Sequence, residues 1–196
     1  EMASEIAKVL GIVPEEVLTA STGVIGMQLR MAPIRKGAPL LKDALTADRR
    51  GAKDAASAIM TTDTVSKECA VTFEQEGTTI TVGGMSKGSG MIHPNMATML
   101  SVITTDAKVS HEVLQGMLSE IVKDSFNMIS VDRDTSTNDT CVLLANGAAG
   151  AEEIKKDTKE YEALYEAVSY VATDLAKKMA GDGEGCTRLL EVIVKG

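Results

Sequence analysis

The stretch Val71-Thr-Phe-Glu-Gln-Glu-Gly-Thr-Thr-Ile-Thr-Val82 decides the fold class of this chain. Residues 71–73 and 78–82 alternate apolar and polar side chains, and Glu76-Gly77 between them is a turn dipeptide. Alternation on both sides of such a turn is typical of a β-hairpin. Met99–Ile103 follows as an apolar, β-branched run, which predicts a buried strand.

Helical patterns precede the hairpin. Glu1–Leu10 has the pattern of an amphipathic helix that ends at Gly11. Leu40–Ile59 is also helix-like, with Gly51 as its weak point. Because the chain begins inside a helix and ends on the strand-like run Leu189–Val194, we expect a fragment of a longer protein.

Two more helices are expected after the hairpin, with a short strand, Cys141–Leu144, between them. Ser110 is expected to cap the first helix, whose apolar face contains Val113, Leu114, Met117, Leu118, Ile121 and Val122. The second ends before Gly181 and is marked by Leu164, Val168, Val171, Leu175 and Met179. No repeat or Pro-rich linker divides the sequence, so it predicts one α/β domain over residues 1–196.

Composition excludes several classes of protein. The 196 residues include 28 acidic and 20 basic side chains, a net charge of −8, so binding of nucleic acid is not expected. No apolar stretch approaches the roughly 18 residues of a membrane helix, so no membrane contact is expected. The three cysteines, Cys69, Cys141 and Cys186, lack CxxC spacing, which argues against a disulfide framework or zinc site and favours a reducing cytoplasm.

The densest glycine cluster is Gly83-Gly-Met-Ser-Lys87-Gly-Ser-Gly90. Such a loop can cradle a phosphate, with Lys87 supplying charge. The order of residues fails the P-loop pattern, however, and a strand rather than a helix is expected to follow. A non-catalytic nucleotide-binding module is therefore a weaker alternative.

Thr98 is a candidate nucleophile at the start of the predicted strand. A threonine hydroxyl needs a base, and neither histidine, His93 or His111, belongs to a recognisable triad. Cleavage of the chain before Thr98 would supply its own α-amino group, whose ordinary pKa is about 7.7 to 8.0. Without further evidence, a lone threonine here is more often only a β-former.

The run from Lys87 to Leu100 resembles the self-cleaving motif of the ornithine acetyltransferase family, the bifunctional glutamate N-acetyltransferases of arginine synthesis. Four further segments match that family in the same order: Ser21-Thr-Gly-Val-Ile-Gly26, Met60-Thr-Thr-Asp-Thr64, Asp134-Thr-Ser-Thr-Asn-Asp-Thr140 and Gly181-Asp-Gly-Glu-Gly185. The resemblance spans essentially the whole chain. The family's proteins are longer, so this chain is expected to be a central fragment.

The resemblance implies a layered αββα sandwich with mixed sheets, like that of similar self-cleaving aminopeptidases. It also implies cleavage between Ala97 and Thr98, which would divide the chain into segments 1–97 and 98–196. Thr98 would be the nucleophile. Thr22 and Gly23 would form the oxyanion hole, where one lost donor typically costs about 2.7 to 4 kcal/mol.

The resemblance further assigns substrate contacts to Thr61, Lys87, Thr98 and Glu184. The transferred acetyl group would come from N-acetylornithine and go to glutamate. Lys87 suits the carboxylate of N-acetylornithine and Glu184 its ammonium. The choice of Thr61 rather than Thr62 or Thr64 stays open.

No cofactor is implied for this cycle, although some family members also use acetyl-CoA as a substrate. A cytoplasmic location is expected, and the resemblance implies a heterotetramer of two processed α and two β chains. Two residues depart from the family pattern, Arg30 and Arg133, and bear on loop shape. An amidohydrolase or aminopeptidase with an N-terminal nucleophile, in which water accepts the acyl group, is the closest alternative.

Other residues with chemical potential are interpreted as structural. His93 is not expected to be the base, and Cys141 and Cys186 are expected to fill space. Asp134, Asn138 and Asp139 suit a hydrogen-bonded loop better than a metal site, so no metal is expected.

Overall fold

The computed structural model describes residues 1–93 and 99–194. The contacts of the chain group into two compact units, Glu1–Ala55 and Ala56–Gly196. The single domain expected over residues 1–196, and its division at the Ala97–Thr98 bond, stay predictions.

The first unit contains the helices α1 (Met2–Leu10), η1 (Pro14–Glu16) and α2 (Met31–Asp43), and the start of α3 (Arg49–Ala58). The predicted end of α1 is confirmed, because Gly11 adopts a left-handed conformation with φ of 76°. Helices α1 and α2 pack together. Arg35 of α2 pairs with Glu5 at 3.0 Å and with Glu1.

The expectation of one helix over Leu40–Ile59 is wrong, because two helices share this stretch. Helix α2 ends at Asp43, and α3 begins again at Arg49. Between them the Asp48 carboxylate accepts the Gly51 amide at 2.8 Å, which is the hydrogen bond of an N-cap residue. Apolar spacing alone did not reveal this cap.

The second unit is built on a sheet of four strands among the described residues, in the order β1 (Lys67–Gln75), β2 (Thr78–Lys87), β3 (Leu100–Thr105) and β4 (Thr140–Ala145). Strand β2 runs antiparallel to β1 and β3, whereas β3 and β4 are parallel. The hairpin is confirmed, with Gln75 opposite Thr78. Both turn residues have positive φ, 48° at Glu76 and 84° at Gly77, as a type I′ turn requires.

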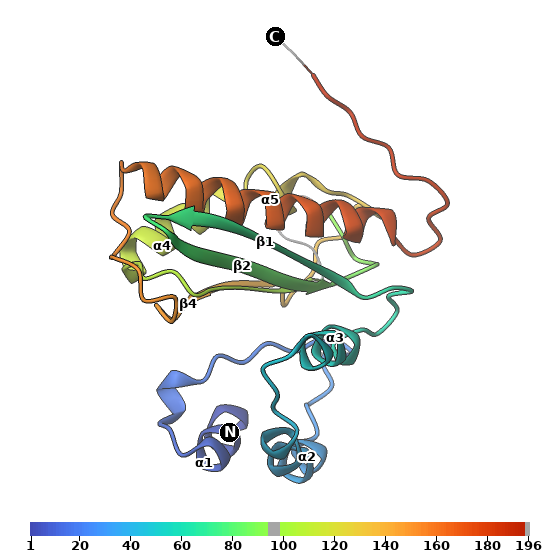
Figure 1. Ribbon diagram of the computed structural model, residues 1–196. Coiled ribbons are helices and arrows are strands. Elements are labelled where there is room, and N and C mark those ends of the chain that lie inside the picture. The colour runs from blue at the N-terminus through green and yellow to red at the C-terminus, as the bar shows by residue number, and fades with distance from the viewer. Residues whose placement is uncertain (94–98, 195–196) are drawn as a thin grey trace. The chain divides into compact units, whose positions relative to one another are not determined.

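Two helices cover the sheet of this unit (Figure 1). Helix α4 (His111–Ile121) connects the parallel strands β3 and β4, as a parallel pair requires. Helix α5 (Lys159–Gly181) packs across β1, β2 and β3 and contacts both α4 and the short helix η2 (Phe126–Met128). The fold class is therefore mixed α/β, as predicted.

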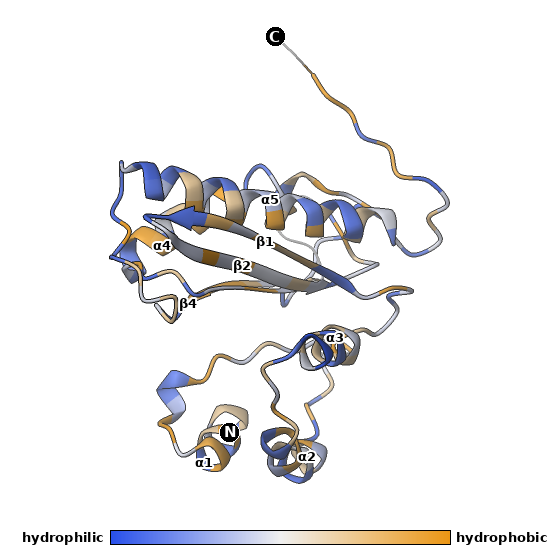
Figure 2. Ribbon diagram, viewed as in Figure 1, coloured by the Kyte–Doolittle hydropathy of each residue, from blue (hydrophilic) through white to orange (hydrophobic). Residues whose placement is uncertain are grey.

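Capping residues fix where both helices begin. Ser110 accepts the Val113 amide at the start of α4, which confirms the predicted cap, and Thr158 does the same for Tyr161 at the start of α5. The core under α5 is almost entirely aliphatic, and Figure 2 shows apolar residues alternating with polar ones along these elements. Fully buried members include Ile80, Val82, Ile103, Leu164, Val168, Val171, Leu175 and Met179.

The glycine cluster is strand rather than loop up to Lys87, which corrects the expected loop. At Gly84 an added Cβ would lie 2.9 Å from Val171 and 3.0 Å from Leu175. Glycine therefore lets α5 approach β2 closely. This contact fixes the strand that carries Lys87.

The predicted strand at Leu189–Val194 is wrong for this chain, because these residues form no strand. Leu190 is 84% exposed and Val194 88% exposed. A β-branched run needs a neighbouring strand before its backbone can form ladder hydrogen bonds.

Candidate active site

Lys87 lies at the end of β2 and is almost fully buried, with 2% of its surface exposed. Its Nζ donates a hydrogen bond to Thr61 Oγ1 at 2.7 Å. The same nitrogen lies 3.8 Å from Asp63 Oδ2. The fold thus brings together two of the predicted substrate-binding residues, Thr61 and Lys87.

Asp63 holds the segments on both sides of this pair. Its Oδ1 accepts the Gly88 amide at 2.7 Å, and its Oδ2 accepts the Thr61 amide at 3.2 Å. Its strongest ionic partner is Lys67, whose Nζ lies 2.7 Å from Oδ1. Lys67 is completely buried and also pairs with Asp182 at 2.6 Å.

The hydrogen bonds of this ion cluster favour charged carboxylates. Burial by itself would raise the pKa of Asp63, but hydrogen bonds from Lys67 and from two backbone amides outweigh it and hold the pKa below the ordinary 3.8. Asp182 shows the same balance: burial opposes ionisation, while Lys67 and Thr64 lower its pKa. Both carboxylates are therefore ionised at neutral pH.

The other two threonines of the Thr61–Thr64 segment have different partners. Thr62 Oγ1 pairs with Ser89 Oγ at 2.6 Å, and Thr64 donates its hydroxyl hydrogen bond to Asp182. Only Thr61 contacts Lys87 among the hydrogen bonds of the described residues.

Glu184 follows α5 and is anchored to the segment after Lys87. Its amide donates to the Ser89 carbonyl at 2.5 Å, while its side chain is exposed. A Cβ added at Gly90 would lie 2.6 Å from the Glu184 carboxylate, which shows how closely this side chain approaches the segment after Lys87. One ammonium group, on Lys87, and one carboxylate, on Glu184, thus flank the same short segment.

Thr22 and Gly23 belong to the first unit, in a stretch without helix or strand. Thr22 is half-buried and Gly23 is exposed. An added Cβ at Gly23 would meet no atom within 4 Å, and its φ is not positive. Nothing within this unit explains why glycine stands at position 23.

Ala97 and Thr98, the predicted cleavage site and nucleophile, lie outside the described residues. The described residues on either side are held by two carboxylates of one loop. Asp132 accepts the amides of Met91 and Ile92, the latter at 2.9 Å. Asp139 accepts the Met99 amide at 2.9 Å.

The loop interpretation of residues 134–139 is confirmed by its hydrogen bonds. Ser136 donates to the Asn138 side chain at 2.7 Å. Burial is the largest influence on Asp139 and raises its pKa, although the bonds from Met99 and Ser136 oppose this. His93 has Ser130 as a partner, with Nδ1 and Oγ 3.4 Å apart, and its structural role stays a prediction.

The half-buried Cys141 is expected to be unreactive. Burial raises the pKa of the Cys141 thiol to about 11, because the thiolate would lose its hydration. Cys141 also packs against the core, as expected of a small apolar side chain. Cys186, in contrast, is exposed, so the expectation that it fills space is wrong for this chain.

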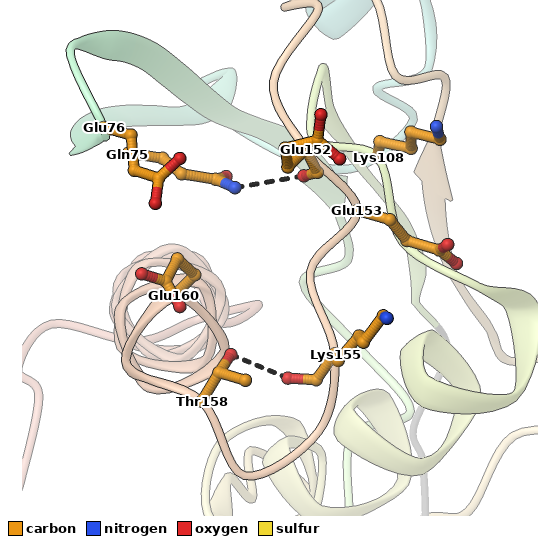
Figure 3. Close-up of a pocket in the computed structure, with 8 residues that line it drawn as sticks. All are labelled: Gln75, Glu76, Lys108, Glu152, Glu153, Lys155, Thr158 and Glu160. Carbon is orange, nitrogen blue, oxygen red and sulfur yellow. Dashed lines mark hydrogen bonds between the residues drawn. The ribbon is translucent and has the colours of Figure 1, made fainter.

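A polar hollow of about 370 Å³ lies elsewhere on the second unit (Figure 3). Its walls come from the β1–β2 turn, the loops after β3 and β4, and the start of α5, and include Gln75 and Glu160. Lys67 and Gln75 are at opposite ends of β1, which spans roughly 26 Å. The hollow is therefore remote from Lys87 and contains none of the predicted site residues.

The charged residues near Lys87, which are Asp63, Lys67 and Asp182, were not predicted from the sequence. Asp63 stands inside the Thr-Thr-Asp match, and Lys67 follows four positions later, which is the only local signal. Asp182 is far from both in sequence, and only packing of α5 on the sheet brings it to Lys67.

The described residues contain neither a cluster of potential metal ligands nor a membrane-spanning helix. No group of three or more His, Cys, Asp or Glu side chains in residues 1–93 and 99–194 is placed to hold a metal ion. None of the helices in those same ranges combines the length and apolar character needed to cross a bilayer.

Known proteins similar to this chain agree with the motifs. The family model described as ArgJ family matches residues 1–196. The arginine biosynthesis bifunctional protein ArgJ of Symbiobacterium thermophilum is 52% identical over 196 residues, which cover all of this chain and 48% of the relative. The protein of the same name from Geobacillus stearothermophilus is 51% identical over 196 residues, with 100% and 47% covered.

A solved structure is also similar. The crystal structure of arginine biosynthesis bifunctional protein ArgJ from Bacillus halodurans shares 45% identity and covers 44% of this chain and 41% of that one, with a TM-score of 0.43. The chain spans about half the length of the curated relatives it matches. With a family model that extends over every residue and identities of about one half, the resemblance seen in the motifs is confirmed, and the chain belongs to the ArgJ family.

Proposed function

We propose that the full-length protein transfers an acetyl group from N-acetylornithine to glutamate through an acyl-enzyme on Thr98. The observation that supports this best is the pairing of Lys87 with Thr61 at 2.7 Å, close to the anchored Glu184. An ammonium and a carboxylate beside one segment suit a substrate that carries both opposite charges. Membership of the ArgJ family supplies the reaction class.

The nucleophile is formed by cleavage of the Ala97–Thr98 bond. In the proposed cycle, the Thr98 hydroxyl attacks the acetyl carbonyl while the free α-amino group of Thr98 accepts the hydroxyl proton. The tetrahedral intermediate breaks its C–N bond, the amine leaves with that proton as ornithine, and the acetyl group stays as an ester on Thr98. The amino group of glutamate then attacks the ester, which releases acetylglutamate and restores the hydroxyl.

Thr22 and Gly23 are proposed to stabilise the oxyanion, and Thr61, Lys87 and Glu184 to bind substrate with Thr98. The hydrogen bonds favour Thr61 over its two neighbours, because Thr61 is the one that contacts Lys87. Glycine at position 23 suits a backbone donor that a substrate must approach closely. Gly23 is exposed, which is compatible with this role.

The complete protein is proposed to form the layered αββα sandwich of the family, with the sheet described here as one layer. Two processed α chains and two β chains would assemble in the cytoplasm. No cofactor is needed for this cycle. Formation of acetylglutamate from acetyl-CoA and glutamate would show that acetyl-CoA is a second acetyl donor.

Intact-mass measurement of the full-length protein tests the proposal first. We expect two fragments, the second beginning at Thr98, and a single uncut chain in Thr98→Ala. Incubation with N-acetylornithine and glutamate should then yield acetylglutamate in the parent and none in the variant. Release of acetate regardless of glutamate would identify a hydrolase, and ATP binding by an uncut parent would identify a nucleotide-binding module; either would reject the proposal.

A further inference from the structure

We propose that Asp63 is a positioning residue for the substrate site, and that Lys67 balances its charge so that the Lys87 ammonium stays available to an anionic substrate. This inference rests on the proposed function, since it assigns substrate binding to Lys87 and Thr61. It concerns the buried residues Asp63 and Lys67, which are not themselves assigned to substrate binding.

Asp63 contacts the backbone beside both Thr61 and Lys87. Asp63 accepts the backbone amides of Thr61 at 3.2 Å and Gly88 at 2.7 Å. One carboxylate therefore fixes the backbone beside both members of the Lys87–Thr61 pair. Because the Asp63 side chain is itself fully buried, it has little room to move.

Two lysine ammonium groups share the negative charge of Asp63. Lys67 and Lys87 both lie near Asp63, but Lys67 is 2.7 Å from it and Lys87 is 3.8 Å from it. A carboxylate left with Lys87 alone would attract that ammonium as its full ionic partner. Lys67 therefore competes with Lys87 for Asp63 and leaves the Lys87 charge less engaged.

Asp182 is a matched control for Asp63, because both carboxylates pair with Lys67. It pairs with the same Lys67 at 2.6 Å and is also largely buried at its side chain. Its other hydrogen bonds in the described part of the chain come from Thr64 and Val65, not from Thr61, Lys87 or Gly88. Removal of either carboxylate leaves Lys67 with one anionic partner, so the two changes cost similar stability by the same route.

The experiment compares Asp63→Asn with Asp182→Asn in the full-length protein. We expect both variants to lower Tm by similar amounts. Asp63→Asn should raise KM for N-acetylornithine about tenfold with kcat changed less than about threefold, because an amide NH₂ would replace the oxygen that faces Thr61 and Lys87. Asp182→Asn should change KM less than about threefold.

A double-mutant cycle shows whether Asp63 acts through Lys87. When Asp63→Asn is added to Lys87→Ala, KM should change less than about threefold, because the group being positioned is already absent. Asp63→Ser, which keeps one acceptor, carries the same expectation if Asp63→Asn does not fold.

Two results would overturn the inference alone: equal KM changes in the Asp63 and Asp182 variants, or an undiminished effect of Asp63→Asn in the Lys87→Ala protein. Both would mean that the cluster only holds the fold. A Lys87→Ala protein with unchanged KM would reject the proposed role of Lys87 itself, and this inference with it.

Discussion

At Asp63, burial and hydrogen bonding act in opposite directions on one carboxylate, and hydrogen bonding prevails. A pKa lowered in the folded chain means that ionisation stabilises the fold at any pH above the ordinary value of 3.8, and that this contribution is lost as the pH falls through the folded pKa. We therefore expect Asp63→Asn to cost stability at neutral pH and to cost progressively less below pH 3.8.

Urea unfolding of parent and variant, at about pH 7 and about pH 3, measures this difference. The gap between their unfolding free energies should narrow at the lower pH. A gap that stays constant would show that the Asp63 charge contributes nothing and that only its shape matters.

Cys141 gives a second prediction for a single residue. With a pKa of about 11, its thiol is almost wholly protonated at pH 8, and the thiolate is the form that reacts with iodoacetamide. Mass spectrometry of the folded full-length protein should show slow alkylation of Cys141 and fast alkylation after unfolding in urea. Equal rates in both states would contradict the assigned burial.

At this scale, motif matching could propose Thr61, Lys87 and Glu184 as site residues, because each stands inside a distinctive run of residues. It could not predict the pairing of Lys67 with Asp182, since nothing local connects residues 115 positions apart. The partner of Lys67 depends on where α5 ends over the sheet, which is a result of packing.

Among the helices, α4 depends on a single side-chain cap. Ser110 accepts the Val113 amide at 3.4 Å, so Ser110→Ala should lower the unfolding free energy by about 0.5 to 1 kcal/mol. Ser119→Ala in the same helix is the control, since Ser119 is exposed and donates to a carbonyl within the helix. Chemical unfolding followed by circular dichroism should show a loss for the first variant only; equal losses would refute the cap.

The contact between β2 and α5 gives the fourth prediction. Gly84→Ala would place a methyl group 2.9 Å from Val171 and 3.0 Å from Leu175, which should cost about 1 to 2 kcal/mol. Gly116→Ala in α4 meets no atom within 4 Å and should instead stabilise by about 0.5 to 1 kcal/mol. Unfolding free energies of opposite sign are expected, and a neutral Gly84→Ala would show that α5 is not held closely against β2.

The helices and strands were predicted correctly where the apolar pattern agreed with a turn or a capping residue. The hairpin had alternation on both sides of Glu76-Gly77, and α4 had Ser110 before a clear apolar face. The prediction of one helix over Leu40–Ile59 was wrong, because Asp48 caps a second helix inside a continuous helical pattern. A loop was also predicted over Gly83–Lys87, where the strand β2 continues. In a sequence, a glycine that allows a helix to pack closely cannot be distinguished from a glycine in a turn.

For the molecule as a whole, the apolar residues Leu189, Leu190, Val192, Ile193 and Val194 form an exposed segment of the second unit. Leu189–Val194 borders a hollow of about 800 Å³ against α5 and the residues around η2. Because the relatives are about twice as long, we expect further parts of the full-length protein to cover this segment.

Hydrogen exchange measures that coverage. Amides of residues 189–194 should exchange slowly in the full-length protein and fast in a chain of residues 1–196 alone. Fast exchange in both would mean that the segment stays uncovered, whatever else the longer protein contains.

The tight β1–β2 turn has a consequence for how such a protein can vary. Lys67 stands opposite Ser86, one position from Lys87, and the two strands meet with only Glu76 and Gly77 between them. Because neighbouring residues of a strand point to opposite faces, one inserted or deleted residue in either strand would turn one lysine away from Asp63. Homologues that keep this ion cluster should therefore show substitutions between the two lysines, but no insertions or deletions.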